Sequence, residues 1–150
     1  MRVFVAGSTG ALGRRLLPLL AAAGHSVVGM TRSVDKAAVI RAAGAEPMVA
    51  DALDAAAVMD AVQRARPEVV VHQLTALPGN LNLRRFDDTF ALTNRLRTEG
   101  TQHLLAAARA AGARRLVAQS YAGWPYAREG GAVKSESDRL DPDPPPPSRA

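Results

Sequence analysis

The sequence has 150 residues, a formal net charge of +5 from 19 Lys and Arg against 14 Asp and Glu, and no cysteine. A chain of this length can bury a core as one domain, and without cysteine it forms no disulfide, thiolate metal site or cysteine nucleophile. No apolar run approaches the roughly 20 residues of a membrane helix, and the first predicted strand begins too early for a signal sequence to precede it. We therefore expect a soluble, cytoplasmic protein.

A short apolar run opens the chain and leads into a helix. Residues 3–6 form a continuous run led by β-formers, which is typical of a strand buried on both faces of a parallel sheet. Helical periodicity starts soon afterwards. The stripe predicted to pack on the sheet consists of Leu12, Leu16, Leu19, Leu20 and Ala23.

Three glycines, Gly7, Gly10 and Gly13, mark the turn between this strand and helix. Gly7 allows a tight turn at positive φ, Gly10 allows a pyrophosphate to approach the backbone, and Gly13 lets helix and strand pack closely. The N–H groups at the helix start would then face the anion. The spacing G-x-x-G-x-x-G is not the commoner G-x-G-x-x-G, but its position between strand and helix favours a phosphate site over an ordinary glycine-rich turn.

The second predicted strand, residues 26–31, is followed by Arg32 and Ser33. Sites for NAD place a carboxylate at this strand end to bind the ribose 2′-hydroxyl, whereas an arginine nearby accommodates the 2′-phosphate of NADP. Asp35 follows, and we interpret it as a helix-start residue. Arg32 therefore predicts a preference for NADP over NAD.

Strands and helices alternate through the next 85 residues or so. We predict strands over 45–50, 68–72 and 115–120, and helices over 36–43, from Asp54 to Pro67, and over 86–111. Ser33 or Asp35 is expected to cap the helix at 36–43, and Gly100 to interrupt the long helix. Pro47 places the third strand at a sheet edge. The predicted fold is therefore an α/β, doubly wound (Rossmann) parallel sheet of about five strands in the order 3-2-1-4-5.

Periodicity disappears beyond Tyr121. We expect a Rossmann domain over residues 1–120, a loop bordering the active-site region over 121–134, and a disordered, proline-rich tail over 135–150. The fifth strand is apolar and would be left as an exposed edge, so self-association through residues 116–118 is also expected.

Five groups of residues, taken in order, resemble the N-terminal part of the extended short-chain dehydrogenases/reductases, the NAD(P)-dependent epimerase/dehydratase family. They are residues 3–13, Asp51, Val69-Val70-Val71-His72, Asn94 with Gly100-Thr101, and Arg114-Arg115-Leu116-Val117.

This resemblance implies a role for twelve residues in holding the dinucleotide. Those that would wrap the pyrophosphate are Gly7, Thr9, Gly10, Ala11, Leu12 and Gly13. Arg32 would contact the adenosine phosphate, and Asp51 with Ala52 the adenine. The nicotinamide ribose would be bordered by Leu74, Thr75 and Ala76.

The chain departs from the family pattern at its catalytic residues. The family's Tyr-x-x-x-Lys pair is absent, because residue 125, four beyond Tyr121, is proline and residue 130, four beyond Tyr126, is glycine. Ser120 and Tyr126 are the remaining candidates, but aligning Tyr126 with the family's tyrosine puts Ala122 at the catalytic serine position. The resemblance thus implies a cofactor domain that stops before the catalytic helix, is inactive alone, and meets a small-molecule substrate only with the missing C-terminal part.

Two other functions remain open at this point. One is a non-catalytic regulatory module that binds NADP as a signal. The other is a basic nucleic-acid-associated protein, although scattered arginine pairs and 4% aromatic residues favour an ordinary solvated surface. No metal site is predicted, because His25, His72 and His103 lie on separate elements without ligand spacing.

Overall fold

The computed structural model describes residues 1–77, 86–120 and 126–143. It forms two compact units, residues 1–118 and residues 119–150. All regular strands and helices of the described residues belong to the first unit.

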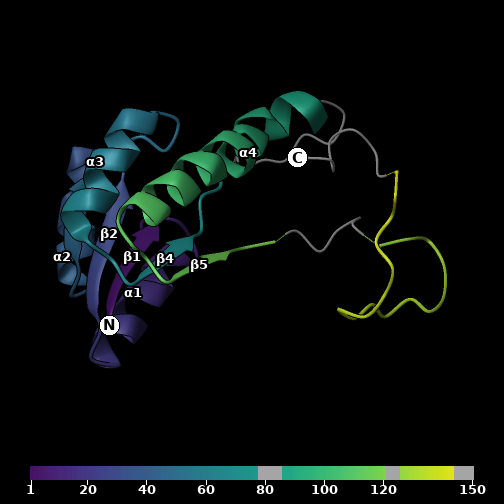
Figure 1. The fold of residues 1–150 in the computed structure, drawn as a ribbon, viewed down its shortest axis with the longest axis horizontal. Coiled ribbons are helices and arrows are strands. Elements are labelled where there is room, and N and C mark those ends of the chain that lie inside the picture. The colour runs from purple at the N-terminus through teal and green to yellow at the C-terminus, as the bar shows by residue number, and fades with distance from the viewer. Residues whose placement is uncertain (78–85, 121–125, 144–150) are drawn as a thin grey trace. The chain divides into compact units, whose positions relative to one another are not determined.

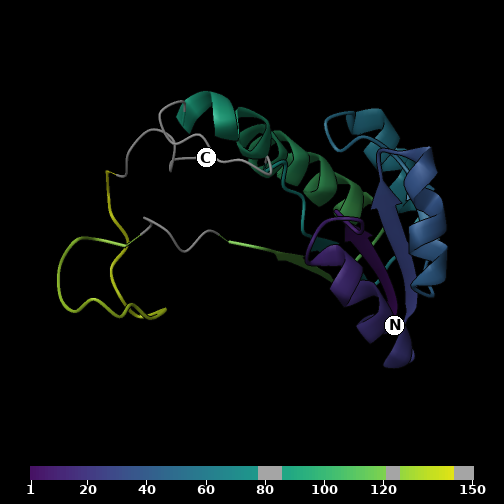
Figure 2. The ribbon, with the colours of Figure 1, turned by 180° about the vertical axis from the view of Figure 1, so that it is seen from behind.

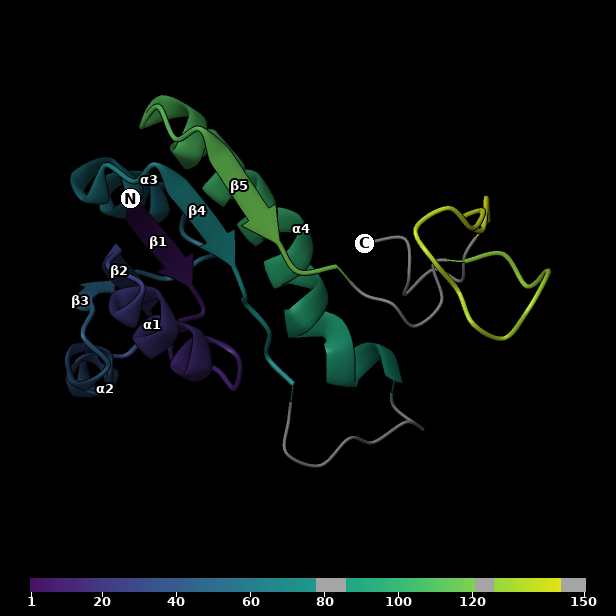
Figure 3. The same cartoon turned by 90° about the horizontal axis from the view of Figure 1, so that it is seen from below.

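Five parallel strands form one sheet in the first unit. They are β1 (Arg2–Ala6), β2 (Ser26–Thr31), β3 (Glu46–Val49), β4 (Val69–His72) and β5 (Arg115–Ala118). Their order is β3-β2-β1-β4-β5, and the arrows of β1, β4 and β5 point the same way in Figure 3. The predicted doubly wound sheet and its strand order are confirmed, and Pro47 lies on the edge strand β3, where its missing N–H costs no ladder bond.

Helices cover both faces of this sheet. They are α1 (Gly13–Ala22), the 3-10 turn η1 (Val34–Lys36), α2 (Ala37–Ala42), α3 (Ala55–Ala65) and α4 (Phe86–Ala110). Leu17 of α1 and Ile40 of α2 share an apolar cluster with Val5 on one face, whereas α3 and α4 pack around Phe4 on the other. Accordingly α4 lies in front of the sheet in Figure 1 and α1 in front of it in Figure 2.

Helix α3 begins and ends as its sequence predicts. The carboxylate of Asp54 accepts hydrogen bonds from the N–H groups of Ala56 and Ala57, each 3.0 Å long, which satisfies two donors at the helix start. Arg66 ends the helix in the left-handed conformation, at φ 43°, directly before Pro67. The predicted inner face is buried, namely Val58, Ala61, Val62 and Ala65.

The predicted inner stripe of α1 is wrong at three of its five positions, Leu12, Leu19 and Ala23. Leu12 and Leu19 are 54% and 68% exposed, and Ala23 is also exposed, whereas Leu17 is fully buried and Leu16 and Leu20 partly so. The reason lies at the start of the helix, where Gly13 packs directly on the backbone of the glycine turn. Once residue 13 faces inward, the i+4 and i+7 positions, 17 and 20, face the sheet.

Two local predictions about the other helices are also wrong. Ser33 occupies the N-cap position of η1, but its side chain makes no capping hydrogen bond, and Asp35 lies inside η1. Since η1 continues directly into α2, the N-cap position of α2 is Lys36. Gly100 does not interrupt α4, which runs through it as one helix. Gly100 is buried, and a Cβ added there would lie 3.8 Å from the Cβ of Ala52, so the small residue allows close packing.

Ion pairs occupy several arginines of the basic surface. Glu68, before β4, accepts a hydrogen bond from the N–H of Arg2 (3.0 Å) and pairs with Arg114. The N–H of Arg2, followed by the Arg114 guanidinium, lowers the pKa of Glu68. The Arg2 guanidinium also lies 3.1 Å from Glu46. These contacts connect the amino ends of four strands at the end of the sheet opposite to the glycine turn.

Strand β5 forms one edge of the sheet, and its Val117 is 45% exposed. In the second unit, Tyr126 and Leu140 form an isolated antiparallel bridge, supported by a 2.9 Å hydrogen bond from the N–H of Ala127 to the carbonyl of Arg139. Residues 121–125 of the predicted loop and 144–150 of the predicted tail lie outside the described residues. Within the described residues, the helices are all too short or too polar to span a membrane.

Candidate functional site

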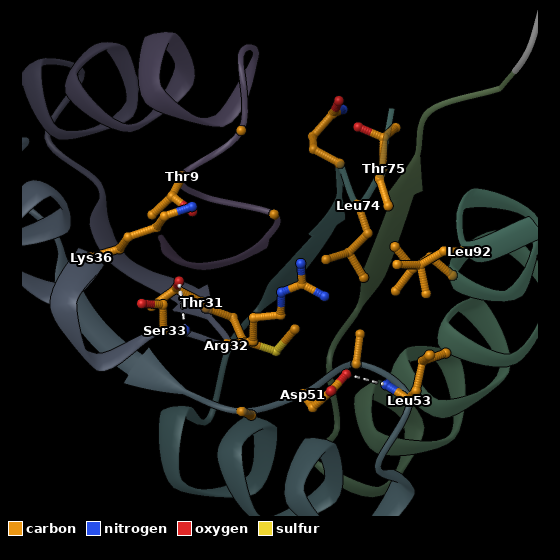
Figure 4. Close-up of a pocket in the computed structure, with 18 residues that line it drawn as sticks. Thr9, Thr31, Arg32, Ser33, Lys36, Asp51, Leu53, Leu74, Thr75 and Leu92 are labelled. Carbon is orange, nitrogen blue, oxygen red and sulfur yellow. Dashed lines mark hydrogen bonds between the residues drawn. The ribbon is translucent and has the colours of Figure 1, made fainter. Parts of the chain in front are cut away.

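A cavity lies at the carboxyl ends of β1, β2 and β4. This is the edge of an open α/β sheet at which ligands bind, and β1 and β4 flank the point where strand order reverses. Arg32 and Lys36 extend into it from the β2 side in Figure 4. Of the twelve residues predicted to hold a dinucleotide, nine line this cavity: Gly7, Thr9, Gly10, Arg32, Asp51, Ala52, Leu74, Thr75 and Ala76.

The turn after β1 is a surface made of backbone. Gly7 has φ +88°, as predicted, and a Cβ there would lie 2.5 Å from the carbonyl oxygen of Gln73 at the end of β4. A Cβ on Gly13 would lie 2.3 Å from the carbonyl oxygen of Gly7. Neither glycine therefore tolerates a side chain without moving backbone.

Gly10 has a different environment. A Cβ added there would lie 3.3 Å from the Gly7 carbonyl oxygen, and the residue is exposed on the cavity. Its N–H donates to that same carbonyl over 3.1 Å, which closes the turn. A side chain at Gly10 would thus project where a ligand approaches, and the Gly7 carbonyl would have to shift by a few tenths of an ångström to accept its Cβ.

Ser8 fixes the turn to the neighbouring strand. Its side chain is fully buried, and its hydroxyl donates to the carbonyl of Met30 on β2 over 2.8 Å. This hydrogen bond fixes the distance between the glycine turn and the end of β2, where Met30 and Thr31 line the cavity. Sequence reasoning missed this role, because a serine within a glycine turn carries no signal of its distant partner.

The start of α1 favours an anion. The first turn of a helix has N–H groups without intrahelical acceptors and a partial positive charge. In α1 the N–H groups of Arg14 and Arg15 donate to the carbonyls of Gly10 and Leu12, each over 3.0 Å, so the N–H groups before Arg14 are the ones that can face an anion. The N-cap residue Leu12 provides no side-chain acceptor, and the first turn contains no acidic residue. Ala11, Leu12 and Gly13 are not among the cavity-lining residues, but they carry the chain from the turn into this uncapped helix start.

The β2 end of the cavity is positively charged. Among the described residues, Arg32 and Lys36 are the two basic residues lining it, and Asp51 is the one acidic residue there. Asp51 is partly engaged, because its Oδ1 accepts the N–H of Leu53 over 3.0 Å (Figure 4). Asp35 does not line the cavity. Sequence reasoning missed Lys36, although its place four residues after Arg32, at the end of η1, was a usable signal.

Helix α4 is hydrogen-bonded to the residues that leave β4. The hydroxyl of Thr93 accepts the N–H of Ala76 over 3.0 Å. His72 is buried, its Nδ1 accepts the N–H of Leu74 over 3.2 Å, and its Nε2 lies 3.2 Å from the carbonyl of Leu96. Since Nδ1 accepts, Nε2 carries the hydrogen and donates to Leu96. Burial lowers the pKa of His72, which keeps this neutral tautomer.

The candidate catalytic residues are not part of the first unit. Ser120 and Tyr126 belong to the second unit, in which Ser120 is exposed and Tyr126 is half-buried in its bridge with Leu140. Within the part of the chain that the structure describes, no group of three or more His, Cys, Asp or Glu side chains is placed to hold a metal ion.

The family model described as NAD(P)H-binding matches residues 7–140. The chain belongs to this NAD(P)H-binding family. It is 52% identical over 152 aligned positions to the 3-diazoavenalumate denitrifying reductase of a Streptomyces species, an alignment that covers 100% of this chain and 47% of that protein. The chain thus spans about half the length of that relative.

Solved structures of enzymes with bound NAD or NADPH share its fold. The UDP-glucose 4-epimerase of Thermus thermophilus, in complex with NAD, is 25% identical with a TM-score of 0.74, over 99% of this chain and 46% of that one. The yeast methylglyoxal/isovaleraldehyde reductase Gre2, complexed with NADPH, is 20% identical with a TM-score of 0.64, over 79% and 36%. Together with the family match, these likenesses confirm the predicted resemblance to epimerase/dehydratase-type dehydrogenases/reductases.

The residues present fit the NAD(P) that this family binds. Gly7 and Gly13 leave no space for a Cβ because backbone packs on backbone there, and Gly7 and Gly10 of the same turn line the cavity. Cations at one end of the cavity complement a phosphate. Gln73 lines the same cavity, and its side-chain oxygen is buried with no hydrogen-bond donor among the described residues.

Acidification is expected to destabilise the fold through His72. Because burial lowers its folded-state pKa below the ordinary 6.5, the unfolded chain binds a proton that the folded chain resists as the pH falls through that value. The free energy of unfolding, measured by urea titration, should therefore be lower at about pH 5.5 than at about pH 7.5. In His72→Gln, whose amide can replace the Nε2–H donor, this difference should shrink; an unchanged difference would show that other groups cause it.

Proposed function

We propose that residues 1–118 bind NADP(H) across the carboxyl edge of the sheet. The pyrophosphate lies on the glycine turn and the start of α1, and the adenine lies against Asp51 and Ala52. Leu74, Thr75 and Ala76 border the nicotinamide ribose. The observation that carries this proposal is the convergence on one cavity of nine predicted residues, which come from four separate segments of the chain.

The proposed preference for NADP rests on charge at the end of β2. Arg32 can hold a 2′-phosphate through two charge-assisted hydrogen bonds, and Lys36 adds a second cation at the same end of the cavity. A site for NAD would present a carboxylate to the ribose hydroxyls here. Asp35 is the nearest acid in sequence to Arg32, and it lies outside the lining.

We further propose that the protein to which this span belongs is a reductase. The relative named as a denitrifying reductase shares 52% identity, whereas the solved epimerase shares 25%. NADPH, when bound, would supply the hydride, and residues 1–118 would supply the side chains and backbone groups that orient the cofactor. The proposed substrate class follows the name of that relative, a diazo compound.

Replacing Gly10 with valine tests the phosphate cradle. Gly10→Val should weaken NADPH binding by about 100-fold or more, because a displaced pyrophosphate loses several charge-assisted hydrogen bonds. The fold should persist by circular dichroism, since a shift of a few tenths of an ångström within the turn relieves the 3.3 Å contact between the added Cβ and the Gly7 carbonyl oxygen. Ala22→Val, on the exposed side of α1, is the control and should bind normally. An unchanged affinity in Gly10→Val would remove the assignment.

Removing the two cations tests the cofactor preference. Arg32→Ala and Lys36→Ala should each weaken NADPH binding by about tenfold or more and leave NADH binding within about twofold, because only NADPH carries the 2′-phosphate. Calorimetry with both cofactors measures this. Arg41→Ala removes an exposed cation of α2 that does not line the cavity, and it should change neither affinity. Equal affinities of the unmodified chain for both cofactors would contradict the preference.

Residues 1–150 alone are expected to bind cofactor without turning over a substrate. The chain contains no Tyr-x-x-x-Lys pair to relay a proton. The exposed edge of β5, with Val117 45% exposed, is expected to pair between copies. An NADPH-oxidation assay with diazo and small carbonyl compounds tests the expected lack of turnover, and oxidation at enzymatic rates would contradict it. Sedimentation velocity tests the expected pairing, and a monodisperse monomer would contradict it.

A further inference from the structure

We propose that His103 of α4 is a positioning residue that holds the loop of residues 51–53 and thereby sets selectivity for the adenine base. Nδ1 of His103 lies 2.9 Å from the carbonyl oxygen of Ala52, 51 residues away in the sequence. This inference rests on the proposed placement of the adenine against Asp51 and Ala52.

The direction of this hydrogen bond follows from its partners. A carbonyl oxygen only accepts, so Nδ1 of His103 carries the hydrogen and donates to Ala52. Both the neutral Nδ1–H tautomer and the imidazolium can make this bond. Ala52 is only 4% exposed, so removal of the donor leaves its carbonyl in a region with little access to water.

His103 belongs to the face of α4 that borders the cavity. Leu92, Leu96, Gly100 and His103 recur at i, i+4, i+8 and i+11, which places them along one side of the helix. Leu92 and Leu96 line the cavity, and Gly100 packs near Ala52. The loop therefore lies on α4, and His103 provides a directional bond within that packing.

Three other hydrogen bonds of the described residues hold the loop and the residues on either side of it. The N–H of Ala50 donates to the carbonyl of Thr31 over 3.0 Å, and the N–H of Asp54 donates to the carbonyl of Asp51 over 3.1 Å. Asp51 Oδ1 accepts the N–H of Leu53 over 3.0 Å, as Figure 4 shows. His103 connects the middle of this loop to α4, and so fixes the direction in which Asp51 and Ala52 present polar groups to the cavity.

The direction of the polar groups on Asp51 and Ala52 determines which purine base the cavity prefers. Adenine carries an amino group that donates hydrogen bonds, and hypoxanthine carries an oxygen that accepts them at the same position. An acceptor such as the Asp51 carboxylate distinguishes the two only if it is held within hydrogen-bond geometry. A loop released from His103 would accept both bases more equally.

The test compares two variants of nearly the same shape. Asn has an amide nitrogen close to the position of His Nδ1 and can donate to Ala52, whereas Leu has the same branching and cannot. Calorimetry gives the affinity of each protein for NADPH and for its analogue with hypoxanthine in place of adenine. We expect the unmodified chain and His103→Asn to prefer NADPH by about tenfold, and His103→Leu to prefer it by about twofold or less.

The outcomes separate this inference from the function on which it rests. If the unmodified chain binds neither nucleotide, the proposed function fails and this inference fails with it. If it binds and discriminates, and His103→Leu keeps the full preference, only the inference is overturned. Should His103→Leu not fold by circular dichroism, His103→Ala replaces it with the same expected loss. Leu105→Asn, at an exposed position of the same helix, is the control and should keep the preference.

Discussion

The structure depends on a backbone contact between the glycine turn after β1 and the end of β4. The glycine turn after β1 lies so close to the end of β4 that a Cβ on Gly7 would come within 2.5 Å of the Gln73 carbonyl oxygen, and Gly13 is equally close to Gly7. Because no side chain separates these segments, the start of α1 and the ends of β1 and β4 converge at the point where strand order reverses. The orientation of α1 follows from this contact, and so does the exposed backbone of the cavity.

Polar side chains then hold the cavity walls in place around that contact. Ser8 connects the turn to β2, His72 connects the end of β4 to α4, and His103 connects the loop after β3 to α4. Each is a side chain bonded to a distant carbonyl, and each contact is buried or partly buried. These hydrogen bonds connect the wall on the side where the base and riboses are proposed to lie, and the cationic side chains of Arg32 and Lys36 line the cavity where a phosphate is proposed to bind.

Much of the fold followed from local patterns in the sequence. A continuous apolar run led by β-formers identified β1, and a run of three valines identified β4. Asp54 and Pro67 bounded α3, and Pro47 placed β3 at an edge. The stripe of α1 was predicted wrongly because leucines occupy positions 12, 16, 17, 19 and 20, so two faces of the helix are apolar. Only the packing of Gly13 against the turn decides between them, and that is a tertiary contact.

The same limit explains which parts of the site sequence reasoning found. The glycines and Arg32 could be recognised because their proposed roles depend on local spacing after a strand. The hydrogen bonds of Ser8, His72 and His103 were not predicted because their partners lie 22, 24 and 51 residues away in the sequence. The most direct measurement of the central claim is a crystal structure of this chain grown with NADPH. We expect pyrophosphate oxygens within hydrogen-bond distance of the backbone N–H groups between Gly7 and Gly13. A dinucleotide bound elsewhere, or a turn without phosphate at saturating cofactor, would contradict this placement.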